Sequence, residues 1–268
     1  MDRLAFIFML TVLIHTVDTF SYSVRIAGVR TKHLALALSL FNIIVLISRT
    51  SNMVQAPLLG SLVDYSIASH TQSSLNFDFR MIIFAATVGG IIGALLIPTF
   101  VKIFTIGINK MQTTGSVPAL IYSGTSLRGV RAIKKSLTKP NLKLLKKIDL
   151  STIPKGFLII NIFITAIYTI GILSAIYAGA MVPAFRLTAS QLSGMINGTA
   201  TILLAMLVDP KAAMITDEAL HEVRPPKDVN TMVALLVGGK IAGTLLGQLL
   251  FMPAVSAVIF LTHLIAHA

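Results

Sequence analysis

The chain has 268 residues, of which 55% are hydrophobic and only 12% are charged, so its polar surface is too small for a soluble globule of this length. The mean hydropathy of +0.85 is typical of membrane proteins. The lack of Cys excludes disulfides, thiolate catalysis and cysteine-ligated metals. The six His residues show no metal-site spacing, so we expect neither a metal nor a cofactor.

Six stretches are long and apolar enough to cross a hydrocarbon core of about 30 Å, which takes about 20 helical residues. They are predicted at about residues 4–24, 34–63, 80–106, 156–178, 188–208 and 231–262. The predicted fold is an all-α integral membrane protein. It divides into a three-helix unit at 1–109, a basic cytoplasmic connector at 110–155 and a second three-helix unit at 156–268.

Lys and Arg residues are distributed unevenly between the two sides of these spans. With the N-terminus outside, the three inner connections hold three, eleven and three of the 22 Lys and Arg residues, and the outer side holds three. Positively charged loops stay inside, so both termini of this multi-pass chain are predicted to lie outside. The net charge of +12 comes mostly from one connector, and we therefore expect no nucleic-acid partner.

Within the connector, residues 126–148 are predicted to form two short basic amphipathic helices separated by Pro140. Leu127, Val130, Ile133 and Leu137 share one side, and Lys and Arg residues occupy the rest. Such a segment favours the surface of an anionic membrane leaflet. A role as a topology determinant without any ligand explains the pattern equally well.

Polar side chains recur at helical spacing on four of the spans. They are His15, Asp18, Tyr22 and Arg25 on the first, Asn42, Arg49 and Asn52 on the second, Ser190, Ser193, Asn197 and Thr201 on the fifth, and Lys240, Thr244 and Gln248 on the sixth. Four such stripes predict one shared polar cavity. The alternative for the Ser, Thr and Asn residues is hydrogen bonding between packed helices.

Two cations fall within membrane spans, where a charge costs roughly 3 kcal/mol and is tolerated mainly beside a cavity or a partner. Arg49 and Lys240 outnumber the embedded carboxylate of Asp18, and this surplus favours an anionic substrate. A guanidinium also matches the geometry of phosphate oxygens. Asp18 is either an ion-pair partner of one of these cations or, together with His15, a site that couples protons or sodium.

The two halves of the chain resemble each other. Residues 48–64 match residues 193–209 without gaps at seven of 17 positions, including Asp64 and Asp209. A Val-Gly-Gly sequence then opens a glycine-rich stretch in the third span of each half. Because three spans is an odd number, the second copy enters the membrane upside down. This pattern predicts two inverted three-helix repeats, an arrangement of transporters with a polar site between the repeats.

Glycines at a spacing of four on the third and sixth spans predict rows of close helix packing. They are Gly89 and Gly93, and Gly239, Gly243 and Gly247. The row on the sixth span fits burial within the chain or at the interface of a homodimer.

The run DTFSYSVRIAGVRT at 18–31, followed by LSLFN at 38–42 and SRTSNMVQAP at 48–57, resembles the Amj family of bacterial lipid II flippases, the alternate to MurJ. The resemblance covers most of the chain and includes residues 192–194 and 207–210. It implies translocation of lipid II, an undecaprenyl-pyrophosphate-linked peptidoglycan precursor, from the inner to the outer leaflet of the bacterial cytoplasmic membrane. It assigns no site residues.

The site residues are therefore predicted from their chemistry. Arg49 and Lys240 are expected to hold the pyrophosphate at mid-depth, and Arg25 and Arg30 to capture it at the inner face. Uncharged hydrogen bonds are expected from Asn42, Asn52, Gln55 and Asn197.

Two other functions stay open at this point: a secondary transporter or channel for a smaller anion, and a polyprenyl-pyrophosphate phosphatase. Such phosphatases also combine inverted repeats with a membrane-embedded Ser-Arg-Ser/Thr element. Here the ExxxE pair of Glu218 and Glu222 lies in a predicted inner loop, and the chain has no GxxxxGK[ST] nucleotide loop. We therefore expect a transporter that is not an enzyme.

Overall fold

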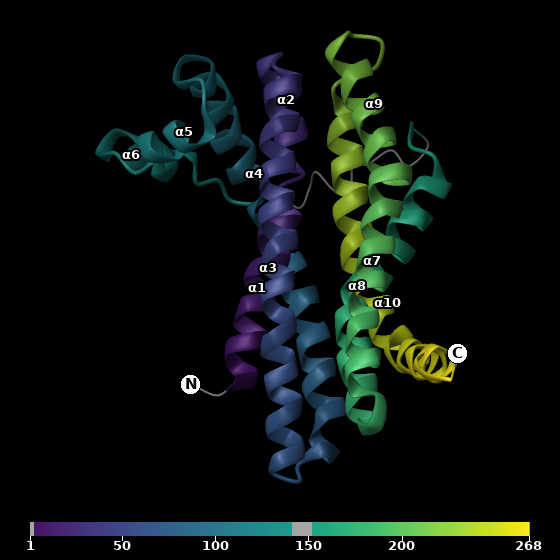
Figure 1. The fold of residues 1–268 in the computed structure, drawn as a ribbon. Coiled ribbons are helices and arrows are strands. Elements are labelled where there is room, and N and C mark those ends of the chain that lie inside the picture. The colour runs from purple at the N-terminus through teal and green to yellow at the C-terminus, as the bar shows by residue number, and fades with distance from the viewer. Residues whose placement is uncertain (1–2, 141–151, 268) are drawn as a thin grey trace.

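A computed structural model describes residues 3–140 and 152–267, and these residues form helices joined by short loops, without strands (Figure 1). Six segments are long and apolar enough to cross a membrane. They are Arg3–Thr31, Leu34–Ala68, Gln72–Thr114, Lys155–Met181, Pro183–Leu220 and Lys227–Ala266. The prediction of an all-α chain with six spans is confirmed. Both termini lie toward one end of the bundle, here called the terminal end, and the connector lies toward the other, the connector end.

The first half contains α1 (Arg3–Phe20), α2 (Ser23–Thr31), α3 (Leu34–Ala68), the 3₁₀ turn η1 (Gln72–Ser74) and α4 (Leu75–Thr114). The first span is interrupted by a turn at Ser21 and Tyr22. The Ser21 and Ser23 hydroxyls donate to the carbonyls of Asp18 and Phe20, at 2.8 and 2.5 Å, and such local bonds compete with the regular helical ladder.

The connector contains α5 (Val117–Gly124) and α6 (Leu127–Ser136). The first of the two predicted basic helices corresponds to α6, and its four apolar side chains are exposed, as an amphipathic surface helix requires. The second predicted helix, after Pro140, falls outside the described residues. Figure 1 shows α5 and α6 projecting sideways from the bundle near its connector end.

The second half contains α7 (Lys155–Met181), the 3₁₀ turn η4 (Pro183–Phe185), α8 (Arg186–Leu203), the π-helical turn η5 (Leu204–Val208), α9 (Asp209–Leu220) and α10 (Lys227–Ala266). The π turn directly precedes Pro210, which has no backbone N–H to donate to the carbonyl of Met206. The fifth span therefore changes its helical repeat at the position of Asp209.

Glycine rows bring the first and third spans of each half into close contact. A Cβ atom at Gly93 of α4 would lie 2.7 Å from the Thr16 carbonyl oxygen of α1. A Cβ atom at Gly243 of α10 would lie 2.7 Å from the Ile162 carbonyl oxygen of α7. The predicted close packing is thus found in both halves. The glycine row on α10 packs against α7 of the same chain. This row therefore needs no homodimer interface to explain it.

The apolar core differs between the two ends of the bundle. At the terminal end, buried side chains from both halves form one cluster that includes Ile7, Leu59, Phe79, Tyr177 and Phe251. Toward the connector end the buried residues form two clusters, one mainly from the second half and one from the first. The halves are therefore joined by a common core at the terminal end and are less tightly joined beyond it.

Three ion pairs among the described residues connect the halves, and two of them involve arginine. Arg25 of α2 binds Asp209 of α9, with 3.1 Å between NH2 and Oδ1, and we call this the buried cross-half pair. Arg186 of α8 binds Asp64 of α3, and we call this the exposed cross-half pair. Asp64 and Asp209 are the two acids that the internal sequence match places at equivalent positions, and each binds an arginine of the other half.

Candidate functional site

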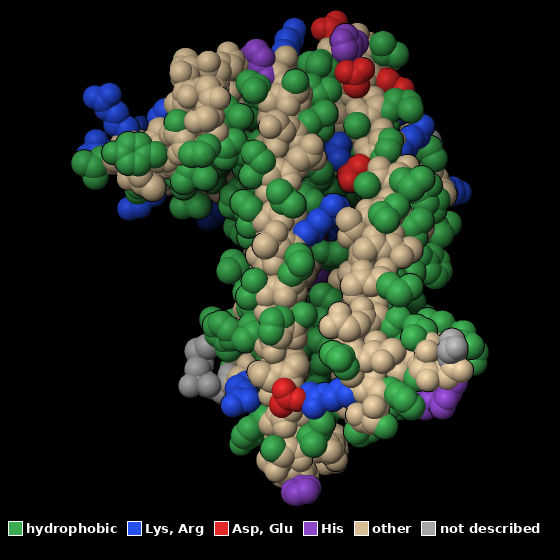
Figure 2. Space-filling view, in the orientation of Figure 1, with side chains coloured by type: hydrophobic (Ala, Val, Ile, Leu, Met, Phe, Trp, Pro, Cys, Tyr) green, Lys and Arg blue, Asp and Glu red, His purple; other side chains and the backbone are tan. Residues whose placement is uncertain are grey.

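A polar cavity lies between the two halves. Its volume is about 600 Å³ including its open mouth. It is lined by His15, Asp18, Ser21, Tyr22, Phe41, Val45, Arg49, Thr165, Tyr168, Thr169, Leu204, Val208, Asp209 and Lys240. Figure 2 shows the surface hollowed between the two columns of helices, with charged side chains at the edges of the hollow. We call this space the charged cavity.

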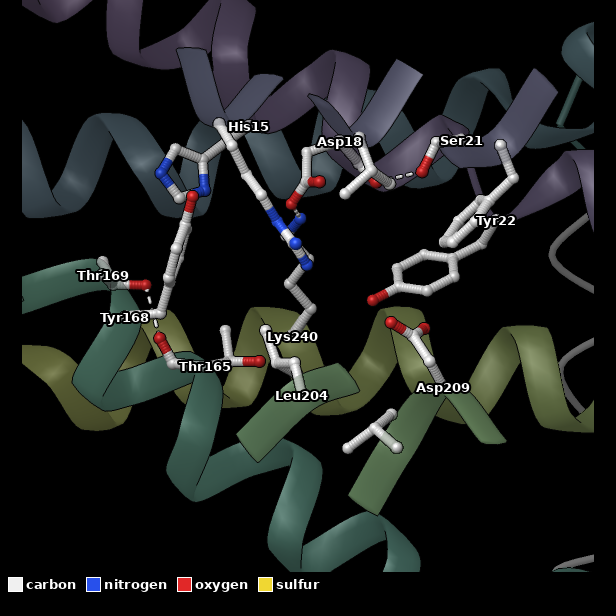
Figure 3. A pocket seen from close by; sticks show the side chains of 14 residues that line it. His15, Asp18, Ser21, Tyr22, Thr165, Tyr168, Thr169, Leu204, Asp209 and Lys240 are labelled. Atoms are coloured by element: carbon white, nitrogen blue, oxygen red, sulfur yellow. Dashed lines mark hydrogen bonds and ion pairs between the residues drawn. The ribbon is translucent and has the colours of Figure 1, made fainter. Parts of the chain in front are cut away.

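Lys240 of α10 and Asp18 of α1 form an ion pair in the charged cavity (Figure 3). The Lys240 side chain is 5% exposed and that of Asp18 is 26% exposed. The Lys240 ammonium also lies 6.0 Å from the centre of the Tyr22 ring. Of the two partners considered for Asp18, the structure selects Lys240 rather than Arg49.

Arg25 was expected at the inner face, but its side chain is only 2% exposed. Its guanidinium lies between the Asp209 carboxylate and the Phe41 ring, whose centre is 4.5 Å from Cζ. The Nε and NH1 groups have no hydrogen-bond partner among the described residues. Arg25 is buried because α2 continues the first span after the turn at Ser21. Arg30, in the last turn of α2, is exposed, so the two arginines do not form one capture site.

Arg49 is half-buried on α3 and lines the charged cavity. Within the described residues it forms no ion pair, whereas Lys240 and Arg25 each have a carboxylate partner. Three cations therefore face two carboxylates in and beside this cavity. The arrangement keeps one guanidinium free for an anion at a depth where water screens charge poorly.

A second cavity of about 340 Å³ adjoins the first, and we call it the uncharged cavity. It is lined by Thr11, His15, Asn52, Gln55, Leu59, Ile82, Ala86, Tyr168, Thr169, Ile172, Leu173 and Asn197. Its lining, as far as the structure describes the chain, includes no Asp, Glu, Lys or Arg. His15, Tyr168 and Thr169 line both cavities, so these two spaces share a wall.

Three of the four amide side chains predicted from sequence line the uncharged cavity. Asn52 Nδ2 donates to the Tyr168 hydroxyl at 2.7 Å, and Gln55 Nε2 donates to Thr11 Oγ1 at 2.6 Å. Asn197 lines the uncharged cavity beside them. Asn42 is exposed and lines neither cavity, so the structure places it apart from the other predicted site residues.

A comparison with known protein families identifies the family of this chain. The model of the Amj family, described as alternate to MurJ, matches residues 10–262.

The chain belongs to the Amj family.

A curated relative, the lipid II flippase Amj of Bacillus subtilis (strain 168), is 40% identical over 261 residues, which make up 97% of each chain. No solved structure matches this chain. The residues that line both cavities in this Amj family member all lie within the matched region.

Some predicted polar positions in this Amj chain hold helices together instead of lining a cavity. Thr87 of α4 donates to Thr244 of α10 at 2.9 Å, and Gln248 Nε2 donates to the Arg80 carbonyl at 2.8 Å. On the sixth span, therefore, Lys240 alone of the predicted stripe reaches the charged cavity. The alternative of interhelical hydrogen bonding holds for the other two residues.

Tyr168 and Asp209 were not identified as site residues from the sequence. A signal for Tyr168 exists, because Thr165, Tyr168 and Thr169 share one helical face of an otherwise apolar span. Asp209 had been noted only as a position in the internal repeat. Figure 3 shows the Tyr22 and Asp209 side chains pointing toward each other within the charged cavity.

Of the residues considered for enzymatic chemistry, Arg49 lines the charged cavity, whereas Glu218 and Glu222 line neither cavity. Glu218 binds Arg224 at 2.8 Å, and Arg224 also binds Asp228 at 3.3 Å, so this acidic segment forms an ion-pair network of its own. The Thr50 and Ser51 hydroxyls beside Arg49 donate to carbonyls of their own helix, each at 2.9 Å. The part of the chain that the structure describes contains no cluster of metal-ligating side chains.

Proposed function

We propose that this Amj family member is a lipid II flippase, which moves the undecaprenyl-pyrophosphate-linked precursor from the inner to the outer leaflet of the bacterial cytoplasmic membrane. The observation that carries the proposal is the Arg49 guanidinium, which forms no ion pair among the described residues and lines a cavity between two halves built of membrane-length helices. The Bacillus subtilis relative is a lipid II flippase by name, which supports the same substrate.

The charged cavity has the chemistry to bind a pyrophosphate. The planar guanidinium of Arg49 can donate two parallel hydrogen bonds to phosphate oxygens. Lys240 and Arg25 carry further positive charge, and a pyrophosphate can compete with the carboxylates of Asp18 and Asp209 for them. Binding then exchanges anionic partners around cations that are already desolvated, so no cation has to be buried alone.

Alternating access follows from inverted repeats, which we propose for the two halves. In support, Gly93 and Gly243 make the same close contact with a carbonyl of the first helix in their own half. The buried and exposed cross-half pairs involve the equivalent acids Asp209 and Asp64. Opening one pair while the other stays closed would expose the site to one leaflet at a time.

The connector end is proposed to face the cytoplasm and both termini the outside. The Lys and Arg distribution supports this orientation. The common apolar core then closes the outer end of the bundle, and the charged cavity lies on the side where the halves are less tightly joined. Both cross-half pairs are formed in this structure, so receiving substrate from the inner leaflet would require the buried cross-half pair to open.

Helix α6 is proposed to lie on the anionic inner leaflet. Its exposed Leu127, Val130 and Ile133 would enter the boundary between headgroups and acyl chains, and its Lys and Arg residues would contact lipid phosphates. Such an anchor would hold the connector at the membrane surface.

The experiment that tests the function compares Arg49→Gln and Arg49→Lys with Lys102→Gln, which removes an exposed cation from α4. Purified proteins in nanodiscs are titrated with fluorescent lipid II. We expect Arg49→Gln to weaken binding about 10-fold to 100-fold, since hydrogen bonds to charged groups contribute about 1.5–3 kcal/mol. Arg49→Lys should keep part of the affinity, and Lys102→Gln should bind as the parent does. Parental affinity in Arg49→Gln would contradict the site.

The same preparation separates the alternative functions. Competition by inorganic pyrophosphate that equals competition by a polyprenyl pyrophosphate would favour a carrier of small anions. Release of phosphate from the lipid would favour a phosphatase. The flippase proposal predicts a strong preference for the polyprenyl lipid and no phosphate release.

A further inference from the structure

We propose that the uncharged cavity is a subsite for a sugar ring attached to the pyrophosphate of the transported lipid. This inference rests on the proposed function and adds a specificity site to it. The charged cavity would hold the pyrophosphate, and the adjoining space lined by amides and hydroxyls would hold the neutral group next to it.

The lining of the uncharged cavity matches the chemistry of a sugar. Asn52, Gln55 and Asn197 each offer an amide that can both donate and accept, and Thr11 and Thr169 offer hydroxyls. No Asp, Glu, Lys or Arg lines the space, so it offers a phosphate no ion pair. Neutral hydrogen-bonding groups are the ones that recognise sugar hydroxyls and N-acyl groups.

Two buried polar atoms of the lining have no partner among the described residues. They are Nδ1 of His15 and Oδ1 of Asn197. The His15 side chain is only 6% exposed, and it lines both cavities. A buried polar atom without a hydrogen bond destabilises the unbound protein, so a ligand that supplies the missing bonds gains binding energy from them.

Space for Asn197 depends on a glycine of the facing helix. A Cβ atom at Gly171 of α7 would overlap the Asn197 side-chain amide. Gly171 is buried and lies one helical turn from Tyr168. The close approach of α7 and α8 thus places the Asn197 amide against α7 at the wall of the uncharged cavity.

The two cavities are spaced for two parts of one molecule. Arg49 and Asn52 lie one helical turn apart on α3, a rise of about 4.5 Å, which suits a phosphate and the ring bonded to it. The hydrogen bond from Asn52 to Tyr168 lies where the two cavities meet.

The direction of this arrangement also fits transport outward. Along α3 the order Arg49, Asn52, Gln55 runs from the connector end toward the terminal end. In the proposed orientation the sugar would lead toward the outside, and the pyrophosphate would follow at the free guanidinium.

The test uses Asn197→Leu, which keeps the branched shape of Asn but removes both polar atoms. Because Asn197 Oδ1 has no internal partner, the change breaks no hydrogen bond made by that atom. Asn197→Ser is a second variant with a smaller polar side chain, and it decides the question if Asn197→Leu does not fold. Asn109→Leu, at an exposed position of α4, is the matched control.

Each full-length protein is titrated in nanodiscs with undecaprenyl pyrophosphate, with the same lipid bearing one sugar, and with lipid II. We expect both Asn197 variants to bind the two sugar-bearing lipids about 5-fold to 10-fold more weakly and to bind undecaprenyl pyrophosphate as the parent does. Asn109→Leu should bind all three as the parent does. Equal effects on the three lipids, or no effect on any, would overturn the sugar subsite.

Arg49→Gln separates this inference from the proposed function. This variant should weaken the binding of all three lipids to a similar degree, because all three carry the pyrophosphate. If Arg49→Gln weakens the binding of all three lipids, but the Asn197 variants change the affinity for the three lipids equally or not at all, the sugar subsite fails and the flippase proposal stands. If neither the parent nor any variant binds a polyprenyl pyrophosphate, the proposed function itself fails.

Discussion

Replacing Asp18 by Asn would leave the Lys240 ammonium without its carboxylate in the charged cavity. The Lys240 side chain is 5% exposed, so water cannot replace the lost partner. Breaking a buried ion pair from one side costs about 3–5 kcal/mol. Asp18 is itself 26% exposed, and we therefore expect the lower end, about 3 kcal/mol. For a chain of this size the melting temperature should fall by roughly 6–12 °C.

The assay is thermal unfolding of purified protein for Asp18→Asn, Lys240→Met and the double variant. Loss of both charges removes the uncompensated ion, so the double variant should regain most of the stability lost by Asp18→Asn. Flipping by the double variant should stay low, because the charged cavity has lost a cation. A melting temperature of Asp18→Asn within 2 °C of the parent would refute the reasoning about the ion pair.

The same variants test the alternative role of Asp18 in coupling. If the carboxylate binds a proton or a sodium ion during transport, Asp18→Asn should stay abundant and folded but lose active flipping. Neutralising Lys240 should not then restore transport. A stable Asp18→Asn protein that flips lipid at the parental rate would exclude both roles.

Three further predictions follow from packing and topology. Gly243→Ala should destabilise the protein by about 1–3 kcal/mol in thermal unfolding, because the new methyl group meets a carbonyl of α7. The control Gly238→Ala places its methyl group in open space and should be neutral or stabilising. Equal effects of the two changes would contradict the packing. Asp209→Asn should lower the melting temperature far more than Asp64→Asn, which breaks the exposed cross-half pair, because surface ion pairs contribute only about 0–1 kcal/mol. A larger effect of Asp64→Asn would contradict the burial of Arg25. An impermeant thiol reagent should label Ser69→Cys but not Thr125→Cys on intact cells, and the opposite pattern would reverse the proposed orientation.

The spans could be predicted from the sequence because the bilayer imposes both length and apolar composition. The faces of individual helices followed from spacing, and for this reason His15, Asp18 and Tyr22 were correctly expected to line one cavity. The glycine rows followed from the rule that small residues allow close packing, and both halves contain them.

The partners of the charged residues could not be predicted in the same way. Helical spacing fixes the direction in which a side chain points but not the neighbour it meets, so Asp18 had two candidate cations. Arg25 meets Asp209 across 184 positions of sequence, a contact that no local pattern encodes. The turn at Ser21 and Tyr22 was also missed, because both residues are acceptable inside an apolar helix, and this turn explains why Arg25 is buried.

The uncharged cavity was only partly visible in the sequence. The chemistry of their side chains indicates Asn52, Gln55 and Asn197 as binding residues, but they lie on helices that are far apart in the chain. Only the packing of these helices brings them into one cavity. Tyr168 was overlooked because it lies in a strongly apolar span. The π turn at Leu204–Val208 directly precedes Asp209 and changes the helical repeat there. No periodic pattern in the sequence indicates such a turn.

Leaflet-resolved transport in vesicles that contain only this protein tests directly whether it is a lipid II flippase that uses Arg49. Fluorescent lipid II is placed in one leaflet, and its arrival in the other is followed by quenching with an impermeant reagent. We expect rapid transfer with the parent and with Lys102→Gln, and transfer near the protein-free rate with Arg49→Gln. Transfer by Arg49→Gln at the parental rate, or by the parent at the protein-free rate, would contradict this expectation.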